Sequence, residues 1–96
     1  MTTDPKEIIQ RILQFKETIV QMDLKIRNYL SDRQYYPHPF PEDLITEIRN
    51  FEKRNYRVNN KEVQLHLEGL LSSLYAYEQS WNKLFENDLE KSKQRE

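Results

Sequence analysis

Apolar residues recur at helical spacing along most of the chain, and the first such stretch covers residues 5–30. Successive apolar positions there lie four and three residues apart in alternation, which is the heptad pattern of a helix that packs against other helices. The positions that define this pattern are Ile8, Ile12, Phe15, Ile19, Met22, Ile26 and Tyr29. Asp4 and Pro5 suit the N-cap and the first helical position, with Glu7 at capping-box spacing, so the sequence predicts a helix that begins here.

Further apolar residues widen this stripe beyond the seam of a two-stranded coiled coil. They are Ile9, Leu13, Val20 and Leu30. A helix with so broad an apolar face is expected to contact more than one neighbour.

A proline-rich segment, QYYPHPFPED at residues 34–43, follows the first predicted helix. Pro37, Pro39 and Pro41 have fixed φ angles and steer the residues before them to extended geometry. We therefore expect residues 36–41 to form a short, stiff connector that sets the angle between two helices, with Pro41 in the first turn of the second. The alternative is a proline-rich ligand for an aromatic-lined groove of a partner protein.

Two more helices are predicted, at about 41–57 and 61–91. The spacing of four and three positions in the first of them is carried by Leu44, Ile48 and Phe51. The next stripe starts at Val63, one position out of phase, so we expect a break at Asn59 and Asn60, either of which can cap the last helix. The stripe of that helix consists of Val63, Leu67, Leu70, Leu74, Tyr77, Trp81 and Leu84.

These elements predict one all-α domain over residues 1–96, an antiparallel three-helix bundle or a coiled-coil hairpin with a proline-rich turn. The charged residues at 92–96 are expected to fray. Only 36% of the residues are apolar, below the usual share of about 45–50%. A short chain with so few apolar residues buries a thin core, so we expect stability to depend on a partner or on self-association.

Small residues form a second stripe on the last predicted helix. They are Gly69, Ser73, Ala76 and Ser80, and Gly69 is the only glycine of the chain. A glycine inside a helix costs about 1 kcal/mol relative to alanine, which close approach of another backbone, from residues 5–30 or from a partner, would explain. A tolerated polar surface is the other interpretation. Tyr75 lies away from the large stripe and is the better candidate for an exposed partner contact.

Charge is unevenly placed, although the net charge is only −1 and favours neither nucleic acid nor an anionic membrane. The stretch 49–61 has a net charge of +4, whereas 62–90 has −5. The basic residues form a candidate patch for an anion or an acidic partner: Arg49, Lys53, Arg54, Arg57 and Lys61. Nucleic-acid binding through this patch is one hypothesis. Charge complementarity within the bundle or across a dimer is the other.

Residues that carry chemistry are scarce. The chain has no cysteine, one glycine and two isolated histidines, His38 and His66, so neither a thiolate metal site nor a glycine-rich phosphate loop is predicted. In size and in the order long, short, long helix, the chain resembles the all-helical chorismate mutases, which would imply a small helical enzyme. The acid-arginine-glutamate cluster that opens the second helix of those enzymes is absent from PEDLITEIR. We therefore expect no enzymatic activity, no cofactor and no metal.

The second half of the chain carries one further resemblance. Residues 44–86 combine a helix, an asparagine-containing elbow and a helix in which Leu70, Tyr77 and Trp81 follow the spacing Leu-x6-Tyr-x3-Trp. This region resembles an uncharacterised helical domain that recurs at the C-termini of myxobacterial and related bacterial proteins. The resemblance implies a helical fold and a bacterial source, and it implies no activity.

The function predicted from these features is that of a non-enzymatic protein–protein interaction module, an adaptor or scaffold acting through its heptad-patterned helices. We expect a cytoplasmic homodimer with no membrane insertion, because no apolar run is long enough and MTTDPKEII lacks the basic start of a signal peptide. The alternatives are the nucleic-acid-binding protein and the helical enzyme.

Overall fold

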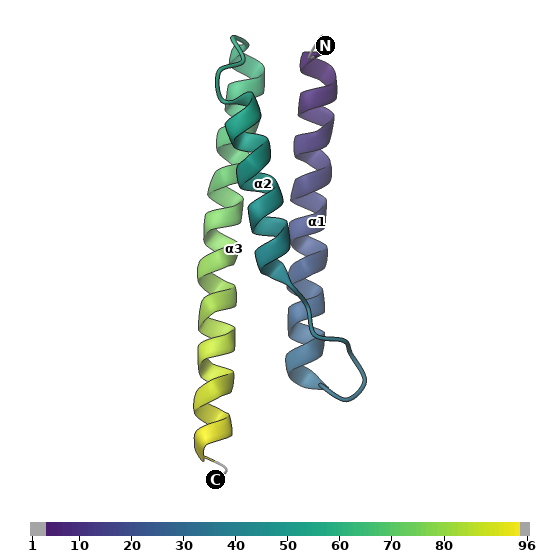
Figure 1. Cartoon of the computed structure of the whole chain (residues 1–96), viewed down its shortest axis with the longest axis vertical. Coiled ribbons are helices and arrows are strands. Elements are labelled where there is room, and N and C mark those ends of the chain that lie inside the picture. The colour runs from purple at the N-terminus through teal and green to yellow at the C-terminus, as the bar shows by residue number, and fades with distance from the viewer. Residues whose placement is uncertain (1–3, 95–96) are drawn as a thin grey trace.

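The structure consists of three α-helices joined by irregular connectors (Figure 1). The computed structural model describes residues 4–94, with side chains through Leu89. α1 spans Pro5–Ser31, α2 spans Pro41–Asn55 and α3 spans Lys61–Gln94. No strand occurs within the described residues, so the predicted all-α class with three helices is confirmed.

The helix bounds lie within a few residues of those predicted from the apolar pattern. Residues 56–60 separate α2 from α3, at the place where the phase of the pattern slips. α3 continues to Gln94 and so extends into the stretch 92–96, where fraying was expected. Residues 95 and 96 lie outside the described part of the chain.

The helices form an elongated bundle of 56 × 21 × 16 Å. α1 and α3 are in the closest contact, and α2 lies against both of them (Figure 1). α2 runs opposite to the two long helices, which are parallel to each other, so the antiparallel packing expected from the sequence is not the arrangement of the main pair. Between residues 4 and 94 no helix has the length and apolar character needed to cross a membrane.

Side-chain caps define where α1 and α3 begin. Asp4 accepts a hydrogen bond from the backbone N–H of Lys6 at 3.0 Å, with Pro5 in the first turn. Asn60 accepts one from the backbone N–H of Val63 at 3.1 Å. These bonds satisfy N–H groups that have no partner inside a helix. Of the two asparagines proposed as caps, Asn60 is therefore the one that caps α3.

The apolar stripes of all three helices meet in one core. Its buried residues are Ile8, Ile12, Phe15, Ile19, Ile26, Leu44, Ile48, Phe51, Val63, Leu67, Leu70, Leu74 and Trp81. Tyr77 and Leu84 of the predicted α3 stripe are half-buried and pack against this core. The heptad positions of the sequence are thus the positions that the bundle buries.

One buried asparagine closes the elbow between α2 and α3. Asn55 is 6% exposed and donates its side-chain amide to the backbone carbonyl of Phe51 at 2.8 Å. From α3, the amide of Gln64 donates to the backbone carbonyl of Val58 at 2.8 Å. A buried polar group without a partner destabilises a fold, so the bond to Phe51 helps to permit an asparagine inside the apolar stripe of α2.

Another polar contact lies between α1 and α3. The indole N–H of Trp81 donates to one carboxylate oxygen of Asp23 at 3.0 Å, and the Nε of Arg27 donates to the other, also at 3.0 Å. The Asp23 side chain is only 19% exposed, so water competes weakly for it. This contact fixes the lengthwise position of α3 relative to α1.

We expect the Trp81–Asp23 hydrogen bond to be measurable in a double-mutant cycle. Trp81→Phe and Asp23→Ala should each lower the free energy of unfolding, and their coupling energy should be about 1–2 kcal/mol, because the acceptor is charged and mostly shielded. Urea unfolding of the four proteins measures it. The control cycle combines Trp81→Phe with Glu17→Ala, which removes an exposed acid of α1. The effects of these two substitutions on the free energy of unfolding should be additive. Additivity in both cycles would show that the bond adds nothing.

The two adjacent asparagines allow a matched test of the cap. Asn60→Ala should lower the free energy of unfolding by about 1 kcal/mol because it removes the acceptor for the N–H of Val63. Asn59→Ala changes an exposed residue with no cap bond and should stay within about 0.5 kcal/mol of the original protein. Equal losses in the two variants would contradict the assignment of Asn60 as the cap.

Candidate functional site

α2 covers one side of the α1–α3 pair. The rings of Phe15 and Phe51 pack edge to face with centroids 5.2 Å apart. Ion pairs flank this contact, from Arg11 to Glu47 at 2.8 Å and from Arg49 of α2 to Glu78 of α3 at 3.3 Å. α2 therefore lies in one of the two grooves between the long helices.

Among residues 4–94, no helix lies over the opposite groove. At about 100° per residue, Leu13, Val20 and Leu24 lie roughly 80–120° around α1 from Ile12, on the side away from Arg11. The four small residues of α3 lie about 60–120° from Leu70, on the side away from Glu78. We call this surface the α1–α3 face and define it by Leu13, Val20, Leu24, Gly69, Ser73, Ala76 and Ser80.

The α1 half of the α1–α3 face is apolar and open to solvent. Leu13, Val20 and Leu24 are 51%, 55% and 59% exposed. Beyond Leu13, the groove continues into a hollow of about 570 Å³ that Ile9 also lines. The broad apolar face predicted for the first helix is thus only partly satisfied by α2 and α3.

Gly69 is the point at which the two halves of the face meet. A Cβ atom placed on Gly69 would lie 3.2 Å from the Nζ of Lys16 and 3.9 Å from its Cε. Within the described residues no backbone atom of another helix comes within 4 Å of that position. The close approach predicted at this glycine is therefore made by the Lys16 side chain, which lies across α3 rather than projecting from the face.

The α1–α3 face differs in charge from the rest of the surface. Charged residues make up 32% of the chain, and the seven defining residues of the face are uncharged, although the ammonium group of Lys16 lies at Gly69 between its two halves. Lys16 and Glu17 are the charged residues between Leu13 and Val20. Depletion of charge, rather than apolar area alone, distinguishes the central part of protein interfaces from ordinary surface.

Tyr75 is exposed but does not belong to this face. Its side chain is 63% exposed, in agreement with an outward position. It precedes Ala76 by one residue and so points about 100° away from it around α3. The structure does not bring Tyr75 together with the small stripe.

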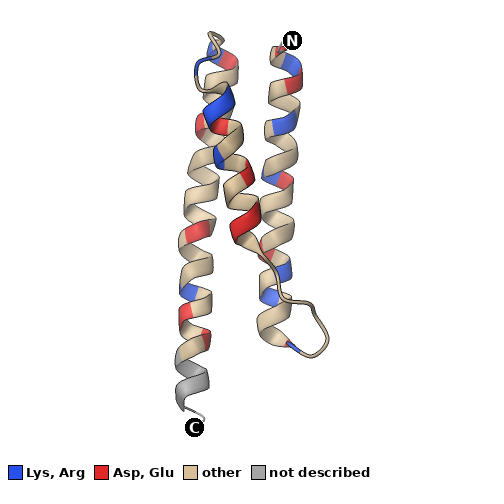
Figure 2. Ribbon diagram, in the orientation of Figure 1, with Lys and Arg blue, Asp and Glu red and all other residues tan. Residues whose placement is uncertain are grey.

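The basic patch is divided between internal contacts and solvent. Figure 2 shows acidic residues at the start of α2 and basic residues toward its end. Arg49 pairs with Glu78 of α3, and the guanidinium of Arg57 lies over the ring of Tyr56, 5.2 Å from its centroid. All five members of the patch are exposed, these two arginines included. Charge complementarity within the bundle thus accounts for part of the patch.

The proline segment packs on the lower part of the bundle. Pro39 and Pro41 are buried, and the ring of His38 lies 4.8 Å from that of Tyr29 and 6.5 Å from that of Phe85. These contacts tie the end of α1 to α3 through the connector. They support the interpretation of the segment as a structural connector.

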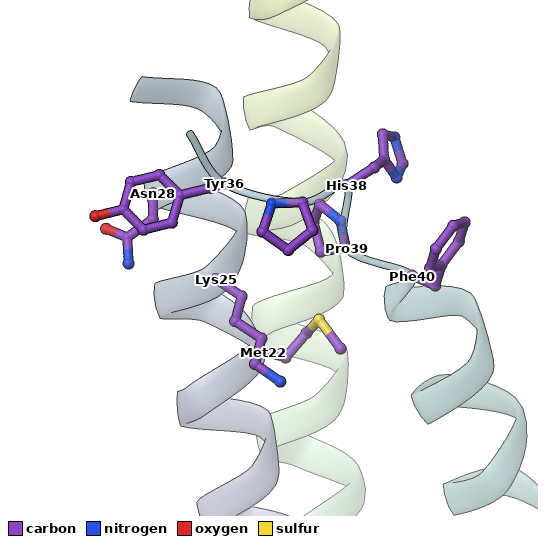
Figure 3. A pocket seen from close by; sticks show the side chains of 8 residues that line it. Met22, Lys25, Asn28, Tyr36, His38, Pro39 and Phe40 are labelled. Atoms are coloured by element: carbon purple, nitrogen blue, oxygen red, sulfur yellow. The ribbon is translucent and has the colours of Figure 1, made fainter. Parts of the chain in front are cut away.

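A hollow of about 520 Å³ lies beside this connector (Figure 3). Met22 and Lys25 of α1 line it from one side, and Tyr36 lies beside Asn28. Lys25 is the charged residue of the lining, which includes no carboxylate. This lining combines apolar side chains with the ammonium group of Lys25 and the imidazole of His38.

The described residues hold no group of three or more histidine, cysteine, aspartate or glutamate side chains that could bind a metal. His38 is in an aromatic cluster, and His66 is half-buried on α3. What the structure does bring together is a surface for packing, formed by side chains from α1 and α3.

We expect Gly69→Ala to raise the free energy of unfolding by about 0.5–1 kcal/mol. Alanine favours the helix, and the atom that its Cβ would meet is the end of a flexible lysine side chain. Urea unfolding in a Val20→Glu background, which disfavours self-association, measures the effect on the single chain. Adding Lys16→Ala removes the crowding and serves as the control. A loss of stability in Gly69→Ala that Lys16→Ala abolishes would show that the lysine cannot move aside.

Comparison with known proteins adds no relative from which a function could be carried over. No protein-family model, curated protein or solved structure matches the chain. The resemblance of residues 44–86 to a bacterial C-terminal domain therefore stays a prediction. In the structure, Leu70 and Trp81 of that spacing are buried and Tyr77 is half-buried.

Proposed function

We propose that the chain is a non-enzymatic protein–protein interaction module, an adaptor or scaffold, that self-associates through its heptad-patterned helices. The observation that supports this proposal best is the α1–α3 face, where three exposed apolar side chains of α1 lie on the same side of the bundle as a stripe of small residues of α3. Exposed apolar surface that is contiguous and poor in charge is typical of an interaction site.

The apolar side chains that the single chain leaves exposed support the same proposal. Leu13, Val20 and Leu24 remain more than half exposed in the single chain. Covering such a side chain fully contributes about 1.5–3 kcal/mol relative to leaving it exposed, so half of that is available at each position. For a domain of this size, whose total stability is of the order of 5–15 kcal/mol, a gain of a few kcal/mol on association is substantial.

The basic patch supports nucleic-acid binding less well. Arg49 is paired with the Glu78 carboxylate, which leaves four exposed cations in a patch of five. Affinity for nucleic acid grows with the number of phosphates neutralised, so four cations make a modest contribution. A bacterial cytoplasmic adaptor remains the proposal.

The molar mass in solution tests the proposal. Light scattering over about a hundredfold range of concentration should give a mass above that of the 11.8 kDa chain. Val20→Glu should weaken association by at least about a hundredfold, because the interface would then bury an unpaired carboxylate at a cost of several kcal/mol. Since Val20 is exposed in the single chain, circular dichroism should show unchanged helix content.

Tyr75→Glu is the matched control for this experiment. It places the same charge on an exposed residue of α3 that does not belong to the α1–α3 face. The molar mass of this variant in solution should equal that of the original protein. An original protein that is monomeric at every concentration would refute self-association. A dimer that survives Val20→Glu but not Tyr75→Glu would move the interface to another surface.

A further inference from the structure

The two halves of the α1–α3 face share one spacing. The exposed apolar residues of α1, Leu13, Val20 and Leu24, are separated by seven and then four positions. On α3, Gly69, Ala76 and Ser80 are separated by the same seven and four positions. Each large side chain of α1 therefore has a small counterpart on α3, always 56 positions later in the sequence.

These counterparts also lie at a similar height along the bundle. Contacts between the parallel helices join Lys16 to Gly69 and Asp23 to Trp81. In these pairs the α3 residue is 53 and 58 positions later than the α1 residue. A separation of 56 falls inside this range, so Val20 and Ala76 lie within about one helical turn of the same height.

We propose that two copies of the chain pack face to face about a two-fold axis parallel to the helices. This proposal rests on the self-association proposed above and specifies its geometry. The axis places α1 of each copy over α3 of the other and keeps every residue at its own height. Val20 then packs over Ala76 of the partner subunit, Leu13 over Gly69 and Leu24 over Ser80, so that each ridge fills a trough in both halves of the interface.

The other two-fold arrangement of the same face fits less well. An axis perpendicular to the helices would place α1 over α1 and α3 over α3, in antiparallel order. Large residues would then meet large ones along one side and small residues would meet small ones along the other. Unequal spacing of this kind leaves gaps, whereas large-against-small packing fills an interface at the density of a protein interior.

The area of the face is of the order that a dimer needs. With the hollow beside Ile9 included, the face extends from Ile9 to Leu24, about 23 Å at ~1.5 Å per residue, and two helices about 10 Å wide give on the order of 450 Å² in projection. Side-chain relief makes the accessible area larger than the projection. Each partner in a stable complex buries about 800 Å².

Gly69 contributes to this geometry through Lys16. The absence of a side chain at Gly69 lets the Lys16 side chain lie across α3 instead of standing up from the face. In the proposed dimer, the Leu13 side chain of the second copy would therefore pack on Gly69 and on the Lys16 side chain beside it. This accounts for the glycine inside α3 without a backbone contact in the single chain.

Disulfide cross-linking tests the arrangement, because the chain has no cysteine of its own. Val20→Cys and Ala76→Cys proteins, one carrying a mass tag, are refolded together from urea and oxidised in a glutathione buffer. The mixed disulfide, which joins position 20 of one copy to position 76 of the other, should exceed the disulfide between two copies of position 20 at least about tenfold. In the proposed dimer the two copies of position 20 lie on diagonally opposite helices, with Cα atoms roughly 10 Å apart, and a disulfide requires Cα atoms within about 7 Å.

Tyr75→Cys is the matched control for Ala76→Cys. It lies one position earlier on α3, is exposed, and faces away from the proposed interface, so it should give at least about tenfold less mixed disulfide with Val20→Cys. Light scattering of each refolded mixture establishes that dimers are present before oxidation.

The outcomes separate this inference from the proposed function. A mixture that contains only monomers would refute both the proposed self-association and the proposed arrangement of the dimer. Dimers that chiefly link position 20 to position 20, or that form no disulfide between positions 20 and 76, would overturn the parallel arrangement and leave self-association intact. Dimers that chiefly link position 20 to position 76, with the Tyr75→Cys control low, would support the proposal.

Discussion

Burial of one apolar stripe against another along the α1–α3 pair is the interaction on which the rest of the structure depends. Ile12, Ile19 and Ile26 of α1 and Leu70 of α3 are fully buried, and Trp81 of α3 is nearly so. Each such side chain contributes about 1.5–3 kcal/mol by leaving water. By contrast, exposed ion pairs such as those that flank α2 contribute about 0–1 kcal/mol each. α2 and both connectors are therefore arranged around a seam that carries most of the favourable energy.

Most of the secondary structure could be predicted from the sequence because the heptad spacing reports directly on which face is buried. The same spacing does not say which helix lies opposite, so the parallel contact of α1 with α3 could not be predicted. Asp23 illustrates the second limit. It is an acid beside the apolar stripe of α1, and its partner, the indole N–H of Trp81, is 58 positions away. Only the need of a buried indole for an acceptor hinted at such a contact.

The candidate face was predictable in parts but not as a whole. The small stripe around Gly69 and the extra apolar residues Leu13 and Val20 were each visible in the sequence. That they adjoin depends on the side of the long helices that α2 occupies, which no local pattern encodes. The position of Lys16 beside Gly69 depends on a side-chain conformation, so it could not be predicted from the sequence either. Tyr75 was also named from the sequence as an exposed residue. It is exposed in the structure, but it does not lie on the α1–α3 face.

The elongated shape affects how the domain can be combined with other polypeptides. α1 begins at one end of the 56 Å bundle and α3 ends at the other, so a sequence joined at either end leaves along the long axis and keeps clear of the α1–α3 face (Figure 1). In a dimer with its two-fold axis along the helices, both amino ends lie together. Two short-linked passenger domains would then share an effective concentration in the millimolar range and could pair with each other even if their own affinity is weak.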